Sequence, residues 1–391
     1  MNKIEQLISR YCPNEVEWKM LGEVCDIFTG GEAPSNNIKG NVPNSILKFP
    51  IYGNGAEIYG YTDTYKIDKD AVTISSIGAN TGTIYFRKAF FTPIIRLKVV
   101  IPKHNNLLPR YLFHYLNSIT ISSKSSSVPN MNASDVKKIP APIPPLSVQK
   151  EIARILDTFT KLTEELTEEL TARKKQYDYY RDQLLNFSKK DIEWKPLKEI
   201  FDLKNGYTPS KSNQEYWISG TIPWFRMEDI RENGRVLSKS IQYVNTCAIK
   251  GGKLFPANSI IIATSATIGE HALITVPFLS NQRFTNLSLK KEYADKFIIK
   301  FLFYYGFVLD EWCKNNITVS NFAGVDMVGF KKFKIPILPL EEQERIVAIL
   351  DKFDTLTTSI SEGLPKEIEL RKKQYEYYRD MLLTFPKKEN V

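Results

Sequence analysis

The stretches PPLSVQKEIARILDTF (144–159) and LPLEEQERIVAILDKF (338–353) carry the same proline, glutamine, isoleucine, leucine and aspartate pattern at a spacing of 194 residues. A second pair, RKKQYDYYRDQLLNF (173–187) and RKKQYEYYRDMLLTF (371–385), repeats at a spacing of 198 residues. The second copy therefore holds four extra residues between its two matches, which is about one turn of an α-helix. Such self-similarity indicates a duplicated architecture, and its order is block, helix, block, helix.

Each repeated pair predicts a long amphipathic helix. Apolar side chains recur every three or four residues from Ile152 to Phe187 and from Ile346 to Phe385, so each helix carries one apolar stripe. Two narrow stripes of this length usually pair as a coiled coil. The first helix runs from the first block to the second, and the second helix starts at the second block. Pairing along their length therefore requires antiparallel helices.

The helix ends carry local signals. Pro144 and Pro145 prevent the preceding chain from being helical, and Ser147 is a candidate N-cap of the first helix. Gly363 and Pro365 interrupt the stripe of the second helix. These two residues predict a kink or short break at that point.

The two blocks combine short strands with a following helix. Turn residues separate the strands, which favours mixed or antiparallel sheets over a doubly wound sheet. The predicted strands lie at 71–78, 81–86, 94–101, 259–265, 271–276 and 285–290, and the predicted helices lie at 109–116 and 294–312. The segment Gly78–Gly82 is predicted to be a hairpin turn. The fold class is therefore α+β, with two pseudo-symmetric mixed α/β blocks, 1–144 and 191–338, separated by two long antiparallel helices, 145–190 and 339–391.

The charge of the chain is concentrated in the blocks. The 391 residues include 53 Lys+Arg and 44 Asp+Glu, for a formal net charge of +9. Each block carries a net charge of +5, whereas the helical segments 145–190 and 339–391 carry +1 and −2. This division predicts a polyanion partner for the blocks and protein partners for the helices.

Signals for several other classes of protein are missing from the sequence. It contains no phosphate-binding loop, no Gly-x-Gly-x-x-Gly after a strand, and no Asn/Asp-Pro-Pro-aromatic motif. The three histidines are isolated, and the four cysteines follow no metal spacing. No apolar run is long enough to span a membrane, and the first residues lack the core of a signal peptide. We therefore expect a cytoplasmic protein with no catalytic, metal or membrane site of its own.

Loops in both blocks are rich in side chains that suit nucleic acid. Asn, Gln, Arg and Ser match the donors and acceptors of base edges, while Lys and Arg neutralise phosphates. The candidates are Ser35, Asn36, Asn37, Lys39, Arg87, Lys124, Asn130 and Asn132 in the first block, and Lys211, Asn213, Arg226, Arg231, Arg235 and Gln282 in the second. Ordinary solvated loops remain the alternative for each of these residues.

Taken together, the repeats resemble the specificity (S) subunits of type I restriction–modification enzymes. The resemblance covers nearly the whole chain. It rests on the Pro-Leu-x-x-Gln-x-x-Ile-x-x-Ile-Leu-Asp starts at 145–157 and 339–351, and on the Trp-x-x-Leu-x-Glu openings at Trp18 and Trp194. In the second block, residues 266–269 followed by Asn281-Gln282 match the family's recognition signature, whereas the first block has no matching Asn-Gln.

The resemblance implies a DNA-binding function without catalysis. Each block would be a target recognition domain that reads one half of an asymmetric, bipartite double-stranded DNA site. The helices would set the spacing and dock two methyltransferase (M) subunits, and restriction (R) subunits would join them. S-adenosylmethionine, ATP and Mg would bind to these partner subunits rather than to this chain.

The residues expected to face protein partners are polar side chains of the two repeated helices. They are Gln149, Arg154, Arg173, Lys174, Lys175, Gln343, Arg345, Arg371, Lys372 and Lys373. For the Arg-Lys-Lys segments, solvated faces and phosphate contacts remain alternatives. For the whole chain, the alternatives are a standalone DNA methyltransferase or endonuclease, and a coiled-coil scaffold that does not bind DNA.

Overall fold

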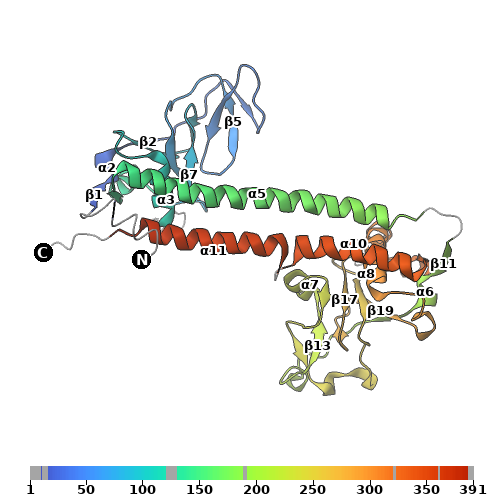
Figure 1. Ribbon diagram of the computed structural model, residues 1–391. Helices are drawn as coiled ribbons and strands as arrows, with labels where there is room; N and C mark the ends of the chain where they lie inside the picture. Colours follow the sequence, from blue (N-terminus) through green and yellow to red (C-terminus); the bar gives the residue numbers. More distant parts are fainter. Residues whose placement is uncertain are drawn as a thin grey trace. The chain divides into compact units, whose positions relative to one another are not determined.

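The chain folds into two compact units, each with its own core (Figure 1). Unit 1 comprises Met1–Leu166 and Ile368–Val391, and unit 2 comprises Thr167–Glu367. The structure, a computed structural model, describes residues 10, 16–119, 130–187, 192–319, 323–359 and 362–385. The predicted contact residue Lys124 lies outside these described residues.

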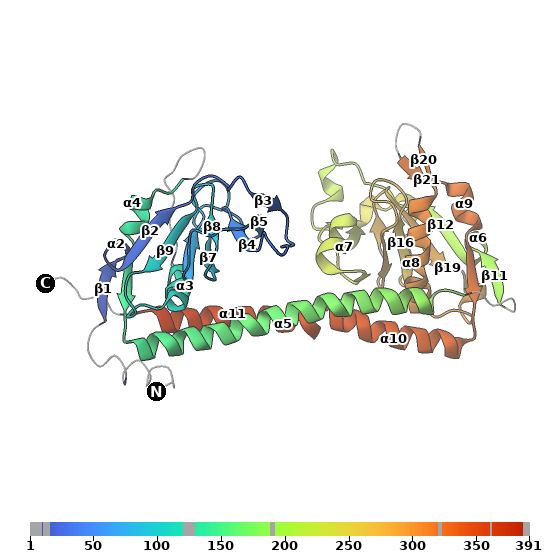
Figure 2. The ribbon, with the colours of Figure 1, turned by 90° about the horizontal axis from the view of Figure 1, so that it is seen from above.

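Unit 1 is built on a four-stranded antiparallel sheet in the order β2-β9-β6-β7. Its strands are β2 Cys25–Thr29, β6 Ala71–Ile74, β7 Ile84–Arg87 and β9 Lys98–Pro102. Helix α3 (Pro109–Ser118) packs against β6 and β7 (Figure 2). It buries Leu112 and Leu116 completely, and this packing forms the centre of the core of unit 1.

A smaller second sheet extends unit 1, in the order β3-β5-β4-β8. Its strands are β3 Asn37–Lys39, β4 Phe49–Tyr52, β5 Ile58–Thr62 and β8 Thr92–Pro93. Strands β4 and β8 run parallel, whereas the other pairs are antiparallel. The remaining elements are the antiparallel pair β1 Glu17–Met20 with β10 Pro140–Ile143, and the short helices α2 Leu21–Val24 and α4 Ala133–Lys137.

Unit 2 has the same plan with a larger main sheet, in the order β12-β19-β16-β17-β14. Its strands are β12 Phe201–Asn205, β14 Val236–Leu237, β16 Ser259–Ala263, β17 His271–Ile274 and β19 Phe284–Leu289. Only the β14–β17 pair is parallel within this sheet. Helix α8 (Ile299–Asn315) packs against β16 and β17, in the place that α3 takes in unit 1.

A second sheet in unit 2 has the order β15-β13-β18, and β13 runs parallel to β18. Its strands are β13 Ile222–Phe225, β15 Tyr243–Val244 and β18 Leu279–Ser280. The strand pairs β11 Glu193–Pro196 with β22 Lys334–Ile337, and β20 Ile317–Val319 with β21 Ala323–Val325, complete the strands. The short helices are α6 Leu197–Ile200, α7 Met227–Asn233, α9 Met327–Lys332, η1 Gln214–Tyr216, η2 Thr246–Ala248, η3 Lys250–Gly252 and η4 Lys291–Tyr293.

The predicted α+β class with mixed and antiparallel sheets is confirmed. Each of the six predicted strand ranges overlaps a strand of a main sheet. The predicted turn at Gly78–Gly82 closes the β6–β7 hairpin, where Gly82 N donates to Ser75 O at 2.8 Å. The predicted helix 294–312 is wrong at its start, because the short helix η4 precedes it and α8 begins only at Ile299.

The long helices are α5 (Leu146–Leu184), α10 (Leu340–Thr358) and α11 (Gly363–Leu383). The predicted break is confirmed, since α10 ends before Gly363. Gly363 has a φ of +81°, and a Cβ there would collide with backbone oxygens of α10. The predicted N-cap Ser147 is wrong, because Val148 N and Gln149 N already donate to Pro145 O. Helix α5 therefore begins at Leu146, two residues before the start at Val148 that an N-cap at Ser147 would give.

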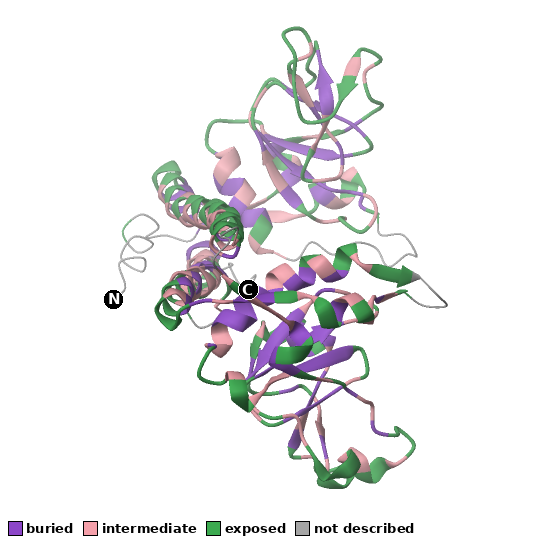
Figure 3. Ribbon diagram, turned by 90° about the vertical axis from the view of Figure 1, so that its right-hand side faces the viewer, coloured by how far each residue is buried: buried purple, intermediate pink, exposed green. Residues whose placement is uncertain are grey.

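Helix pairing within each unit is antiparallel. In unit 1, Phe159 near the start of α5 stacks on Tyr378 near the end of α11, with ring centroids 5.1 Å apart. In unit 2, Tyr180 near the end of α5 stacks on Phe353 of α10 at 5.6 Å. Buried residues lie where the strands and helices pack against one another, and the outer faces of the helices are exposed (Figure 3).

The repeated aspartate of each Ile-Leu-Asp motif joins a long helix to the main helix of its unit. In unit 1, Asp157 accepts from Arg110 Nε at 2.6 Å and lies 2.7 Å from His114 Nε2. In unit 2, Asp351 contacts two side chains of α8, Lys300 Nζ and Tyr304 OH, both at 2.6 Å. The duplicated motif therefore holds equivalent helices together with different partners.

Candidate nucleic-acid interface

A cluster of polar side chains forms where the two parallel strands of unit 2 end. Strands β13 and β18 align Phe225 with Ser280, and Asn281 N donates to Phe225 O at 3.1 Å. Arg226, the first residue after β13, and Gln282, the second residue after β18, therefore lie at one edge of the small sheet. Gln282 and Arg283 are both exposed there.

A tight loop after β12 packs under this edge. Gly206 N donates to Phe284 O at 3.0 Å, and Tyr207 N donates to Ser280 O at 2.8 Å. A Cβ at Gly206 would collide with the Ser280 and Asn281 carbonyl oxygens, so the loop needs glycine at this close approach. Further along the same loop, the Thr208 hydroxyl bonds the side-chain carbonyl of Gln282.

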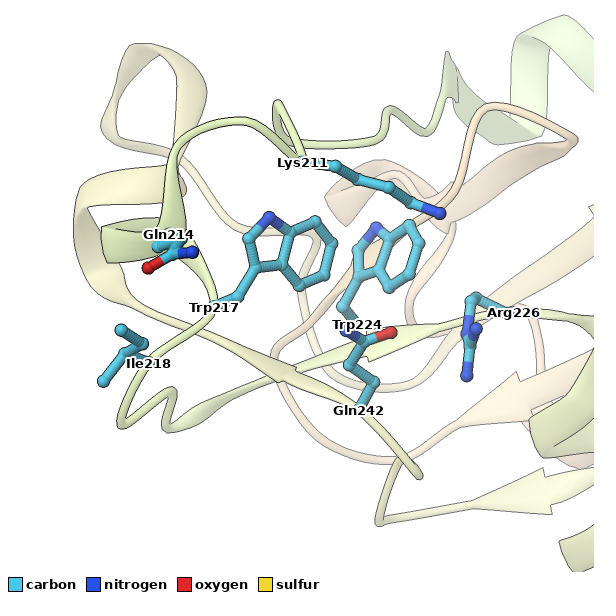
Figure 4. A pocket seen from close by; sticks show the side chains of 7 residues that line it. All are labelled: Lys211, Gln214, Trp217, Ile218, Trp224, Arg226 and Gln242. Atoms are coloured by element: carbon cyan, nitrogen blue, oxygen red, sulfur yellow. The ribbon is translucent and has the colours of Figure 1, made fainter.

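The edge borders a pocket of about 430 Å³ (Figure 4). Its lining combines two tryptophans, two cations, two amides and one isoleucine: Lys211, Gln214, Trp217, Ile218, Trp224, Arg226 and Gln242. The two indoles meet edge to face at 5.1 Å. Their N–H groups are used inside the unit, because Trp217 Nε1 donates to Ser210 O and Trp224 Nε1 donates to Tyr207 O, both at 3.0 Å. These bonds hold the rings in place.

The pocket has a positive and aromatic character. The Arg226 guanidinium lies 5.5 Å from the Trp224 ring centroid, and its closest carboxylate, Glu228, is 3.9 Å away. Its buried Nε has no hydrogen-bond partner in the described part of the chain. Lys211 is exposed, and no carboxylate lines the pocket. Aromatic faces with cations and amides suit the bases and phosphates of a nucleic acid.

Four of the six candidates in the second block lie together at this edge: Lys211, Asn213, Arg226 and Gln282. Asn213 also has a structural role, because its side-chain oxygen accepts from Glu215 N at 3.1 Å. The other two candidates do not line the pocket, since Arg231 lies on α7 and Arg235 follows its end. Arg231 borders a different cavity, beside Glu270 and Asp354.

Arg235 is committed to contacts inside unit 2. Its guanidinium donates to His271 O at 3.1 Å, lies 3.4 Å from Asp310 Oδ2, and packs on the Phe307 ring with its centroid at 4.9 Å. The buried His271 and Asp310 are themselves paired at 2.6 Å. Arg235 is therefore placed as a structural residue, away from the predicted DNA contacts.

Unit 1 has an equivalent edge built from the parallel strands β4 and β8. Ile94 N donates to Tyr52 O at 2.9 Å, as Asn281 N does to Phe225 O. Gly30 N donates to Leu97 O at 2.7 Å, as Gly206 N does to Phe284 O. The turn 94–97 of unit 1 therefore occupies the place of the turn 281–284 of unit 2. These matches pair Arg96 with Arg283 and place Gly53 where unit 2 has Arg226.

Arg87, a predicted DNA contact in unit 1, is instead buried, with 8% of its surface exposed. Its guanidinium donates to Gly55 O at 2.9 Å and to Ala56 O at 3.0 Å, and it packs on Tyr52 with its centroid at 3.9 Å. Burial lowers the pKa of this guanidinium. The prediction for Arg87 is therefore corrected, because its side chain is buried and donates hydrogen bonds to the loop that follows β4.

The other candidates of unit 1 lie on and beside β3 or next to α4. The Asn36 amide donates to Asp63 at 2.7 Å and the Asn37 amide to Pro34 O at 2.6 Å, and the Lys39 ammonium lies 5.7 Å from the Tyr59 ring centroid. Ser35 is exposed beside them. Asn130 pairs with Ile77, and Asn132 N donates to Asp135 in the first turn of α4. Their contacts with DNA stay predictions.

The predicted partner contacts of Gln149 and Gln343 are corrected, because both side chains are fully buried. Gln149 accepts from Leu108 N at 2.8 Å and donates to Asn106 O and Pro144 O, both at 2.8 Å. Gln343 makes the same three bonds in unit 2, starting with Ile298 N at 2.9 Å. Each glutamine thus caps the first turn of the main helix of its unit, which explains its repetition.

The remaining helix candidates lie at the surface. Arg154 pairs with Glu151 at 2.6 Å, and the equivalent Arg345 pairs with Glu342 at 2.8 Å. The others are exposed or half-buried on α5 and α11: Arg173, Lys174, Lys175, Arg371, Lys372 and Lys373. No helix within the described ranges is long and apolar enough to cross a membrane.

Several residues of the two edges were missed at the sequence level. In unit 2 they are Trp217, Trp224 and Gln242. In unit 1 they are Asn54, Ile95 and Arg96. No sequence signal marked Arg96, because it lies inside the predicted strand 94–101, whereas Arg283 stands just before the predicted strand 285–290.

Comparisons with known proteins match this duplicated plan. The family model described as the type I restriction modification DNA specificity domain matches residues 13–173 and again 189–370. The EcoR124I/EcoR124II specificity subunit of Escherichia coli is 39% identical over 412 residues, covering 100% of this chain and 99% of the relative. The EcoprrI specificity subunit of Escherichia coli is 61% identical over 206 residues, which cover 51% of each chain.

Solved structures show the same fold at low sequence identity. An S subunit from M. genitalium superposes with a TM-score of 0.57 at 17% identity, covering 96% of this chain and 98% of its own. A chain from a structural study of the assembly of a type I restriction–modification system gives 0.58 at 18% identity, covering 95% and 98%. Since the family model covers both repeats and a full-length relative shares 39% identity, this chain belongs to the specificity subunits of type I restriction–modification systems.

Proposed function

We propose that this chain selects the DNA sequence on which a type I complex acts, with unit 1 and unit 2 each reading one half of a bipartite site. The observation that carries this proposal is the equivalent strand-end edge of the two units, with Arg283 exposed in one and Arg96 in the other. The same arrangement of strand ends therefore presents an exposed arginine in each unit. Duplicated DNA-binding modules read two half-sites whose separation follows from protein geometry.

The two half-sites are expected to differ. Unit 2 offers Arg226, Gln282 and the tryptophan pocket, whereas unit 1 has Gly53 and Ile95 at the matching positions. Arginine and glutamine recognise guanine and adenine edges, while an aliphatic side chain suits a thymine methyl group. These differences support an asymmetric target.

The helices are proposed to dock two methyltransferase subunits, which restriction subunits then join. The support is a repeated surface: Tyr179 of α5 and Tyr377 of α11 are 62% and 57% exposed, each beside an Arg-Lys-Lys segment. Tyrosine and arginine are enriched at protein interfaces. S-adenosylmethionine, ATP and Mg are proposed to bind to those partners.

The separation of the half-sites is proposed to depend on helix length. Helix α5 is continuous over 39 residues and belongs to both units, which corresponds to about 58 Å at about 1.5 Å per residue. Removing one turn from α5 and one from the paired helices is expected to change the spacer of the methylated motif. Altered bases inside a half-site would contradict this proposal.

The central experiment measures sequence-dependent DNA retention by the chain assembled with its methyltransferase partner, at several salt concentrations. We expect tight binding to one bipartite motif and a steep salt dependence from phosphate contacts. Stoichiometric binding of S-adenosylmethionine to the isolated chain would instead support a standalone methyltransferase. Retention that is independent of sequence would support a scaffold.

A further inference from the structure

The turn at residues 94–97 of unit 1 is unusual in its backbone. Leu97 N donates to Ile94 O at 3.1 Å, and the two central residues, Ile95 and Arg96, have φ values of +53° and +58°. Two successive positive φ angles define a turn that favours Asn-Gly. A β-branched isoleucine is strained in that region, so its presence calls for a role that the fold alone does not supply.

The surrounding residues hold this turn in place. Ile95 N donates to Gly31 O at 2.8 Å, and Arg96 N donates to Gly30 O at 3.0 Å. The Asn54 amide donates to Ile95 O, and the buried Ser76 hydroxyl donates to Arg96 O at 2.7 Å. Every backbone polar group of the two strained residues is therefore satisfied, as expected for strain retained at a functional site.

The held turn presents its two side chains outward. Ile95 is 51% exposed, and Arg96 is exposed without an ion pair among the described residues. Arg96 corresponds to Arg283 of unit 2, so arginine stands at this position in both units. Ile95 corresponds to Gln282, so this position differs between the units. A side chain shared by both units suits the phosphate backbone, which is the same at every site, and a side chain that differs suits the bases.

We propose that Ile95 reads a base edge in the half-site of unit 1 by apolar contact with a thymine methyl group, while Arg96 neutralises an adjacent phosphate. This inference rests on the proposed DNA-recognition function and assigns it to residues in unit 1. The strained turn holds the Ile95 side chain at the surface. A residue that tolerates this backbone better, such as asparagine, would lack the apolar side chain that makes the contact.

The test compares three assembled complexes with the methyltransferase partner: wild type, Ile95→Asn and Arg96→Ala. Asparagine tolerates positive φ, so Ile95→Asn is expected to raise the Tm by about 2–4 °C. The same variant is expected to bind the wild-type motif about tenfold more weakly and to relax one position of one half-site. Arg96→Ala is expected to leave the motif unchanged and reduce the salt slope by about 1.

A matched control is Ile46→Asn, since Ile46 is also an exposed isoleucine of unit 1 but lies outside the turn. This control is expected to keep the wild-type motif, affinity and Tm. The inference is overturned if Ile95→Asn keeps the wild-type motif and affinity, or if Arg96→Ala changes the motif. If the wild-type complex itself shows no sequence-dependent binding, the proposed function fails as a whole, and the two failures are thereby distinguished.

Discussion

In unit 1 the carboxylate of Asp157 holds a histidine of α3, whereas in unit 2 the equivalent Asp351 holds a tyrosine of α8. The buried glutamines Gln149 and Gln343, by contrast, make the same three bonds in both units. The bonds that satisfy backbone groups are therefore repeated closely, and side-chain pairs at the helix junction vary in chemistry. The strand-end edges vary most, which is where the two units are proposed to meet different DNA sequences.

The largest expected effect tests the repeated frame. In Gln149→Ala or Gln343→Ala, one backbone N–H and two carbonyls lose their partners in a buried site. Each variant is expected to lose about 3 kcal/mol of unfolding free energy, measured by denaturant unfolding of the full chain. Gln176→Ala is the control, because Gln176 is partly exposed and its side-chain oxygen accepts from the surface residue Arg173. A loss of unfolding free energy in only one of the two variants would show that the two buried glutamines are not equivalent.

A smaller effect is expected at the edge that differs between the units. Removing the guanidinium in Arg226→Ala should weaken binding to the wild-type motif by about 1–3 kcal/mol. Methylome sequencing should show relaxed recognition in the half-site of unit 2 alone. Arg231→Ala is the matched control, since Arg231 belongs to the same stretch but lies outside the pocket. Equal relaxation by both variants would contradict the assignment of the pocket.

The histidine of unit 1 predicts a pH dependence that the tyrosine of unit 2 does not share. Burial lowers the pKa of His114 and outweighs the nearby Asp157, while Arg110 lowers it further. The unfolded state therefore binds the proton more readily, and stability present above about pH 6.5 is lost as the pH falls below it. The slope cannot exceed about 1.4 kcal/mol per pH unit for one proton. Unfolding of wild type and His114→Tyr should differ in this slope, and identical profiles would contradict the prediction.

The sequence predicted the elements that depend on local pattern. The apolar stripes, the break at Gly363 and three strands of each main sheet follow from periodicity and turn residues, whereas strands β2, β12 and β14 were not predicted. It could not separate Arg226 from Arg235, because only the packing of α7 turns one toward the pocket and the other toward His271. The burial of Arg87 could not be predicted either, because it also depends on tertiary packing: its partners are backbone carbonyls more than 30 residues away in the sequence.

The smallest effect on folding is expected at the surface ion pairs of the long helices. Arg154 and Arg345 are exposed, and each pairs with a half-buried glutamate three residues earlier. Such surface pairs contribute little to stability. Alanine variants should therefore unfold like wild type. If the two sites dock equivalent partners, each variant should weaken assembly with the methyltransferase subunit, as measured by analytical ultracentrifugation, and to a similar degree. Weakening by one variant alone would show that the two units, although built on one frame, present different docking surfaces.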